Sequence, residues 1–173
     1  LCGRMADMVR SSKTPFETAI RLSIAGNVID FGAPGCPPEE KLPALVEAAL
    51  DNSLVGTPAE TLRQAAERAE TILVLGDNAG EIAFDRFLLE ALGPDRCAYA
   101  VKGAPIINDA TMDDARQVGL TEWVEVIDNG SDAPGTILED CSAEFRRRFD
   151  EADLVISKGQ GNYETLSDVR KNI

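Results

Sequence analysis

The chain has 173 residues, of which 44% are apolar and 5% aromatic, and this is the composition of a globular domain rather than a disordered one. Its 30 acidic residues outnumber its 17 basic residues, so the formal net charge is −13. Binding to phosphate backbones needs clustered lysine and arginine, so we expect neither nucleic acid nor an anionic membrane as a partner. No apolar run reaches the ~20 residues of a membrane span.

Histidine is absent, and the cysteines at positions 2, 36, 97 and 141 are widely scattered. The missing histidine excludes Ser–His and Cys–His nucleophile pairs, and the cysteine spacing does not form a metal knuckle. Any bound metal must therefore be held by oxygen, which favours Mg²⁺ or Mn²⁺ over Zn²⁺ or Cu²⁺. Scattered thiols are typical of a reducing compartment, and we expect the protein to be cytoplasmic.

The first 70 residues show only helical patterns. Thr14-Pro15 precedes an apolar helical pattern over residues 16–25 and places proline at the first helical position. A polar loop is predicted over residues 27–32, after this helix ends. Further helices are predicted over residues 4–12, 39–50 and 58–70. We interpret residues 1–70 as a helical segment that forms part of a cap or a helical subdomain.

From Thr71 onward, predicted strands alternate with helices. The strands cover residues 71–75, 97–101, 123–127 and 153–157, and the helices between them cover residues 80–92, 112–118 and 142–151. Long crossovers predict an α/β fold, with a mostly parallel sheet in an α/β/α sandwich and the helical segment at one end. We expect residues 71–173 to be a metal-binding core that is truncated at its C-terminus.

Each predicted strand is followed by polar residues. These are Asp77-Asn78, Asn108-Asp109, Asp128-Asn129, and Lys158 with Asn162. In a parallel sheet these ends lie on one edge, where ligands bind, and carboxylates with a lysine there suit a hard cation bound to a phosphate. Each pair alone is more often a helix cap or a turn than a ligand. It is the succession of four that favours a site.

Glycine-bearing turns accompany two of these strand ends. Backbone N–H groups at Ala79-Gly80 and at residues 159–161 are suited to cradle an anion. The dinucleotide fingerprint G-x-G-x-x-G does not follow the first strand, and the Walker lysine motif is absent. The site is therefore of neither of these common nucleotide-binding types.

Several motifs resemble those of a known family. They are residues 76–81 (GDNAGE), 102–105 (KGAP) with 108–111 (NDAT), and 157–162 (SKGQGN). With the polar stretch over residues 27–32, they resemble the damage-control phosphatases, which include the ARMT-type proteins. The resemblance is closest to the stand-alone prokaryotic branch and covers nearly the whole chain in the right order.

This resemblance implies metal-dependent hydrolysis of small phosphate esters, with Mn²⁺ or Mg²⁺, or Co²⁺ or Ni²⁺, as the cofactor. The implied substrates are sugar phosphates or damaged phosphometabolites. It implies Asp77, Asn78 and Asp109 as the metal ligands and Lys158 as the residue that holds the phosphate. It also suggests further residues around the substrate, namely Asn27, Asp30, Glu81, Asn108 and Asn162.

The mechanism that we expect is attack of a metal-activated water on a phosphomonoester. Lys158 would offset charge on the equatorial oxygens, and Asp77 or Asp109 would orient the water. Direct attack by Asp77, which would form an aspartyl-phosphate, stays open.

Two other interpretations also stay open. One is a non-catalytic receiver-like or sugar-phosphate-binding α/β domain, although it lacks a second acid beside Asp77. The other is a structural domain whose polar strand ends only cap helices. The physiological substrate and the oligomeric state are not predicted.

Overall fold

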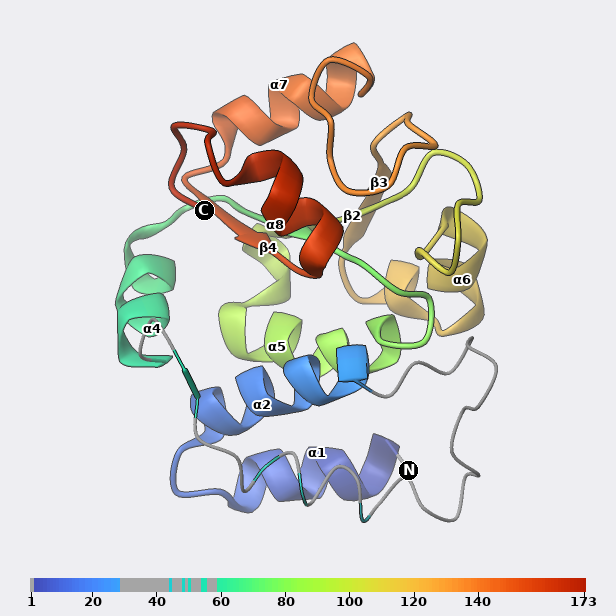
Figure 1. The fold of residues 1–173 in the computed structure, drawn as a ribbon. Coiled ribbons are helices and arrows are strands. Elements are labelled where there is room, and N and C mark those ends of the chain that lie inside the picture. Colours follow the sequence, from blue (N-terminus) through green and yellow to red (C-terminus); the bar gives the residue numbers. More distant parts are fainter. Residues whose placement is uncertain (1, 29–43, 45–47, 49, 51–53, 56–58) are drawn as a thin grey trace.

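The computed structural model describes residues 2–28, 44, 48, 50, 54–55 and 59–173 (Figure 1). Asp30 lies outside the described residues, as does most of the helix predicted over residues 39–50. In the part of the chain that is described, no helix has both the length and the apolar character needed to cross a membrane.

A four-stranded sheet forms the centre of the molecule, with the strand order β3-β2-β1-β4 and every pair parallel. The strands are β1 (Ile72–Leu75), β2 (Cys97–Val101), β3 (Glu125–Asp128) and β4 (Leu154–Ser157). The inner strands β1 and β2 are buried along their whole length, which explains their unbroken apolar sequences. The predicted parallel α/β sheet is therefore confirmed.

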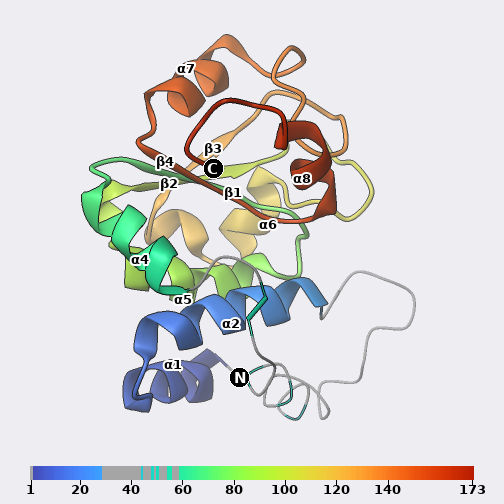
Figure 2. The ribbon, with the colours of Figure 1, turned by 60° about the vertical axis from the view of Figure 1, so that its left-hand side comes forward.

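Helices cover both faces of this sheet, as Figures 1 and 2 show. On one face lie α7 (Ala143–Glu151) and α8 (Gln160–Leu166). On the other lie α4 (Ala59–Arg68), α5 (Ile82–Leu92) and α6 (Met112–Gln117). This three-layer arrangement confirms the predicted α/β/α sandwich.

Alternate residues of the strands fill two separate cores, because successive side chains of a strand point to opposite faces. Short 3₁₀ turns, η2 (Pro94–Arg96) and η3 (Leu120–Glu122), lead into β2 and β3. The core under α5 contains, among others, Ile72, Val74, Leu88, Leu92 and Tyr99. The core under α7 and α8 contains, among others, Leu73, Leu75, Ala100, Phe145 and Phe149.

Two N-terminal helices, α1 (Cys2–Ser11) and α2 (Pro15–Val28), lie outside the α5 layer (Figure 2). The start of α2 at Pro15 is as predicted, but the helix runs beyond the predicted end at residue 25. Gly26 does not end the helix. Its lack of a side chain instead allows α2 to pack closely on α5. A Cβ on Gly26 would lie 3.0 Å from Cβ of Phe84 on α5. Asn27 consequently lies in the last turn of α2 rather than in the predicted loop.

Helix α8 was not predicted, because its sequence was interpreted as a glycine-rich loop. Gly159 has φ of 82° and turns the chain into the helix. Gly161 lies inside the helix, where a Cβ would come within 3.0 Å of the backbone nitrogen of Gly135. The glycine at this position therefore permits close packing of a helix on a loop and does not break the helix.

The loop that follows β2 carries Asn108 and Asp109 and contains a strained residue. Ile107 has φ of 50°, in the left-handed region that β-branched residues rarely adopt. Its side chain is 82% exposed, so little packing offsets this strain.

We predict that Ile107→Asn stabilises the protein by about 1 kcal/mol, because asparagine tolerates the left-handed conformation. The melting temperature should rise by roughly 2–4 °C. Ile137→Asn is the matched control, since Ile137 is also exposed but has no positive φ. Equal losses of melting temperature in both variants would contradict the assignment of strain to Ile107.

Candidate active site

The segments that follow β1 and β2 are joined at the carboxyl edge of the sheet. Asn78 and Asp109 form an isolated antiparallel bridge. The backbone N–H of Ala79 donates to the carbonyl of Asn108 at 2.8 Å, and that of Ala110 donates to the carbonyl of Asp77 at 2.7 Å. The structure therefore brings together the two pairs that sequence patterns placed at separate strand ends.

The carboxylates of Asp77 and Asp109 influence one another. Burial raises the pKa of Asp77, and the negative charge of Asp109 raises it further. A hydrogen bond from Asn27 and the charges of Lys158 and Lys102 oppose this shift. The negative charge of Asp109 is therefore unfavourable for the charged form of Asp77, and a cation between the two carboxylates would relieve this repulsion.

Gly159 leaves the space that the Asp77 side chain occupies. A Cβ on Gly159 would lie 2.1 Å from Cγ of Asp77, far inside van der Waals contact. The positive φ of Gly159 also disfavours any other residue. The turn after β4 is therefore fitted to the first acidic residue of the site.

Lys158 lies in a buried ion cluster beneath this edge. Its ammonium contacts a carboxylate oxygen of Asp85, lies 3.2 Å from Oε1 of Glu81, and donates to the carbonyl of Ser23 at 3.3 Å. Both carboxylates are 0% exposed. Burial lowers the pKa of Lys158, but the charges of Asp85 and Glu81 outweigh it and leave the pKa above its ordinary value. Lys158 is thus a charged residue whose donors all point to protein groups.

Asp85 is the centre of this cluster. It accepts hydrogen bonds from the Ser23 hydroxyl at 2.6 Å and the Tyr99 hydroxyl at 2.5 Å, besides its contact with Lys158. Burial raises the pKa of Tyr99 well above its ordinary value, so the phenol keeps the proton that it donates. Sequence reasoning missed Asp85, although an acid four residues after Glu81 on an apolar helix was a usable signal. Nothing in the sequence around Ser23 or Tyr99 indicated that these residues contact Asp85.

Asn27 connects helix α2 to the acidic residues. Its side-chain amide donates to Oδ2 of Asp77 at 2.9 Å and to Oε2 of Glu81 at 2.6 Å. Oε1 of Glu81 accepts the backbone N–H of Asp77 at 3.1 Å. Burial is the main cause that raises the pKa of Glu81, to about 7. Both predicted residues therefore lie against Asp77 and fix its position.

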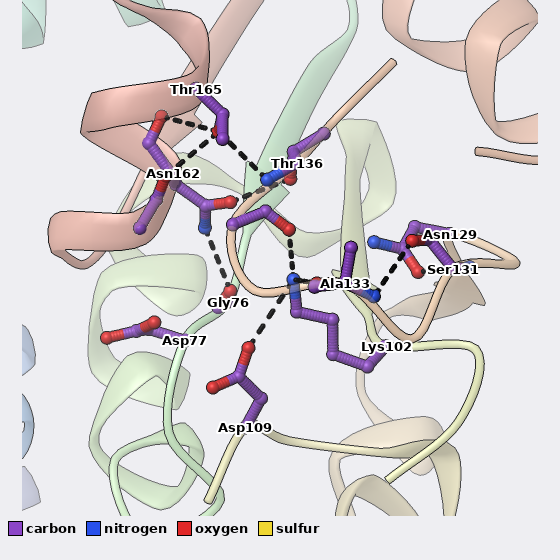
Figure 3. Close-up of polar contacts among 12 residues, drawn as sticks. Gly76, Asp77, Lys102, Asp109, Asn129, Ser131, Ala133, Thr136, Asn162 and Thr165 are labelled. Carbon is purple, nitrogen blue, oxygen red and sulfur yellow. Dashed lines mark hydrogen bonds and ion pairs between the residues drawn. The ribbon is translucent and has the colours of Figure 1, made fainter. Parts of the chain in front are cut away.

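Asn162 also lies at the edge, but its side chain braces the backbone. Its amide nitrogen donates to the carbonyls of Gly76 at 3.2 Å and Lys158 at 2.8 Å. Its amide oxygen accepts the Thr136 hydroxyl at 2.7 Å. These bonds, drawn in part in Figure 3, join the ends of β1 and β4 to the loop after β3.

Asp128 and Asn129 form a turn at the end of β3, which was one of the two interpretations of these residues. Asp128 is exposed and accepts the backbone N–H of Gly130 at 3.0 Å. The side chain of Asn129 accepts backbone N–H groups of Gly103 at 3.0 Å and Ser131 at 2.9 Å. The pair therefore ties together the loops after β2 and β3.

Lys102, at the end of β2, is a site residue to which sequence reasoning gave no role. It is 4% exposed. Its ammonium donates to the carbonyls of Ala133, at 2.9 Å, and Gly135, and it forms an ion pair with Asp109 at 3.4 Å (Figure 3). The usable signal was a lysine directly after a buried strand, which is the same pattern that drew attention to Lys158.

The donor chemistry of Asp77, Asn78 and Asp109 fits a hard divalent cation. Within the described ranges, no three carboxylate, thiolate or imidazole side chains are grouped in a way that could hold a metal ion. Two carboxylates would therefore need other oxygen donors, and the Asn78 amide lies next to Asp77 in the sequence. Two carboxylates and an amide offer oxygen donors only, which suits Mg²⁺ and Mn²⁺. Such ions are commonly held by one or two carboxylates, with waters and substrate phosphates as the remaining ligands.

The fold defines an α/β protein with a parallel sheet, and the candidate site lies at the carboxyl edge of that sheet, where ligands bind in such folds. A family model described as the damage-control phosphatase ARMT1-like domain matches residues 1–173, and the chain belongs to this family. The resemblance found in its motifs is thereby confirmed.

Archaeal relatives and one solved structure agree with this assignment. A damage-control phosphatase of Pyrococcus horikoshii is 42% identical over 96% of this chain and 58% of its own length. A damage-control phosphatase of Archaeoglobus fulgidus is 35% identical over 94% of this chain and 57% of its own length. The crystal structure of a DUF89 family protein from P. horikoshii matches with a TM-score of 0.85 and 39% identity, over 98% of this chain and 60% of that one. The chain thus spans somewhat under two thirds of these relatives.

The fit between Gly159 and Asp77 gives a prediction. Gly119→Ala places alanine in the left-handed region and should cost roughly 1–2 kcal/mol of stability. Gly159→Ala should cost more, because φ of 82° with ψ of 159° is a conformation that essentially only glycine adopts. Only Gly159→Ala also displaces Asp77, because a Cβ on Gly119 meets nothing within 4 Å. Thermal stabilisation by Mn²⁺ should therefore be lost in Gly159→Ala and kept in Gly119→Ala. Equal stabilisation of the two variants would be the contrary result.

Proposed function

We propose that this protein is a metal-dependent phosphatase that hydrolyses small phosphomonoesters, such as sugar phosphates or damaged phosphometabolites. The observation that carries the proposal is the bridge between Asn78 and Asp109, which joins the segments after β1 and β2. The ion pair of Asp109 with Lys102 and the influence of Asp109, Lys158 and Lys102 on the pKa of Asp77 support it. The relatives from P. horikoshii and A. fulgidus are damage-control phosphatases, which supports a phosphatase.

The proposed metal ligands are Asp77, Asn78 and Asp109. A bound divalent cation supplies Lewis acidity toward a phosphoryl oxygen and lowers the pKa of a coordinated water. Asn27 and Gly159 support this role, since one donates to Asp77 and the other leaves it room. Manganese or magnesium is proposed from the oxygen donors alone, and cobalt or nickel from the family resemblance.

The surrounding residues orient the reactants and balance charge. Asp77 or Asp109 orients the attacking water by accepting its hydrogen bond. The positive charge of Lys158, held in place by Asp85 and Glu81, offsets charge that develops on the phosphoryl oxygens. Asn27 is near the leaving group in this proposal, because α2 covers the α5 side of the site. The alternative, attack by Asp77 itself, requires the same residues.

Phosphate release from p-nitrophenyl phosphate and from a panel of sugar phosphates tests the proposal. Release should require Mn²⁺, Mg²⁺ or Co²⁺ and stop with EDTA. Asp77→Ala and Asp109→Ala should each lower the rate on the order of 100-fold or more, the scale of losing one stabiliser of transition-state charge.

The matched control is Asp113→Ala, because this carboxylate is 91% exposed and lies in the next helix after Asp109. It should retain the full rate. Undiminished release by the Asp77→Ala, Asp109→Ala double variant in EDTA would refute metal-dependent catalysis. Mn²⁺ binding without turnover of any ester would instead favour the non-catalytic binding domain.

A further inference from the structure

Two buried lysines lie at the carboxyl edge of the sheet, and their partners differ. Lys158 is matched by two carboxylates, Glu81 and Asp85, and its remaining contact is with a carbonyl. Among the described residues, Lys102 is matched by one carboxylate, that of Asp109. Its other partners are neutral carbonyls of the loop after β3.

The contact between Lys102 and Asp109 is long, as is the 3.3 Å contact of Lys158 with the Ser23 carbonyl, but only the former involves a proposed metal ligand. Its 3.4 Å exceeds the 2.7–3.2 Å range of ordinary N–H···O hydrogen bonds. Lys102 therefore has two donors fixed on carbonyls and a third that faces the acidic residues without a tight partner. An oxygen atom that accepts from this third donor in place of Asp109 replaces a long contact and leaves both bonds to the carbonyls unbroken.

The carbonyls that accept from Lys102 belong to the loop after β3, and hydrogen bonds to α8 fix this loop in place. Thr136 donates its hydroxyl to Asn162 at 2.7 Å and its backbone N–H to the Thr165 hydroxyl at 2.9 Å. A Cβ on Gly135 would lie 2.3 Å from the carbonyl oxygen of Gly161, which shows how closely this loop packs on α8 (Figure 3). These carbonyls therefore fix the position of the ammonium, and its third donor can bind a ligand without rearrangement of the loop.

Charge balance indicates the chemistry of the missing partner. Once Asp109 shares its charge with a cation, Lys102 has no other carboxylate partner among the described residues. A buried ammonium without a counter-ion is unfavourable, and an anion beside it relieves that cost. The positive charge of Lys102 is felt at Asp77 as well, so this anion would lie next to both acidic residues.

We propose that Lys102 binds the phosphoryl group directly, by donating to one of its non-bridging oxygens, while Lys158 acts from beneath as a fixed charge. This inference rests on the proposed phosphatase function. It assigns Lys102 a catalytic role, because its ammonium touches the substrate.

Inorganic phosphate is the probe for this role. Its affinity in the presence of Mg²⁺ is measured by isothermal titration and by competition against p-nitrophenyl phosphate. Lys102→Gln should weaken phosphate binding at least about tenfold, the scale of one charge-assisted hydrogen bond. Lys102→Arg should restore part of the affinity. Mg²⁺ affinity should persist in both variants, which a loss of the whole site would not allow.

Lys13→Gln is the matched control, since Lys13 is exposed on the connection between α1 and α2. Phosphate affinity equal to wild type in folded Lys102→Gln would overturn the role of Lys102 and leave the phosphatase proposal intact. A wild-type protein that neither binds phosphate nor releases it from esters would overturn both.

The wild-type protein decides the question if Lys102→Gln does not fold. In ¹⁵N-labelled protein with Mg²⁺, added phosphate should shift the side-chain ammonium signal of Lys102 more than that of Lys158. A larger shift at Lys158 would show that Lys158 is the phosphate donor and would overturn the inference.

Discussion

The buried contact between Lys158 and Asp85 joins elements that are far apart in the sequence. Lys158 follows β4, Asp85 lies on α5, and the hydroxyls that complete Asp85 come from Ser23 on α2 and Tyr99 on β2. Removing one member of such a cluster leaves an uncompensated buried charge, which typically costs 3–5 kcal/mol. The cluster therefore holds the helical layer, the sheet and the base of the site in one arrangement.

The two lysines at this edge differ in how far protein carboxylates compensate their charge. Lys158 is fully matched by protein carboxylates and sets the potential beneath the acidic residues. Lys102 is only partly matched, and it is anchored to the loop that α8 holds in place. In the function that we propose, Asp77 and Asp109 bind a cation and Lys102 is left with positive charge for an anion beside it. Phosphate esters with a divalent metal have this combination of charges.

Much of the fold was predictable, because local patterns carry it. The strand over residues 97–101 was predicted with its observed bounds, since a strand buried on both faces must be apolar throughout. The proximity of Asp77 and Asn78 to Asp109 was predictable because parallel strand ends share an edge. The contacts of Asp85 were not, because Ser23 and Tyr99 are separated from it by 62 and 14 residues. Helix α8 was missed because Gly161 has a low helix propensity. This glycine is needed for close packing on the loop at Gly135, and a tertiary contact of this kind cannot be seen in the local sequence.

In the proposed function, Asp77, Asn78 and Asp109 bind one divalent cation. Titration of the protein with Mn²⁺, followed by electron paramagnetic resonance of the free ion, measures this directly. The account predicts one bound Mn²⁺ per chain in the wild type and none at the same concentrations in the Asp77→Ala, Asp109→Ala double variant, which should remain folded. One Mn²⁺ bound with unchanged affinity by the double variant would contradict it.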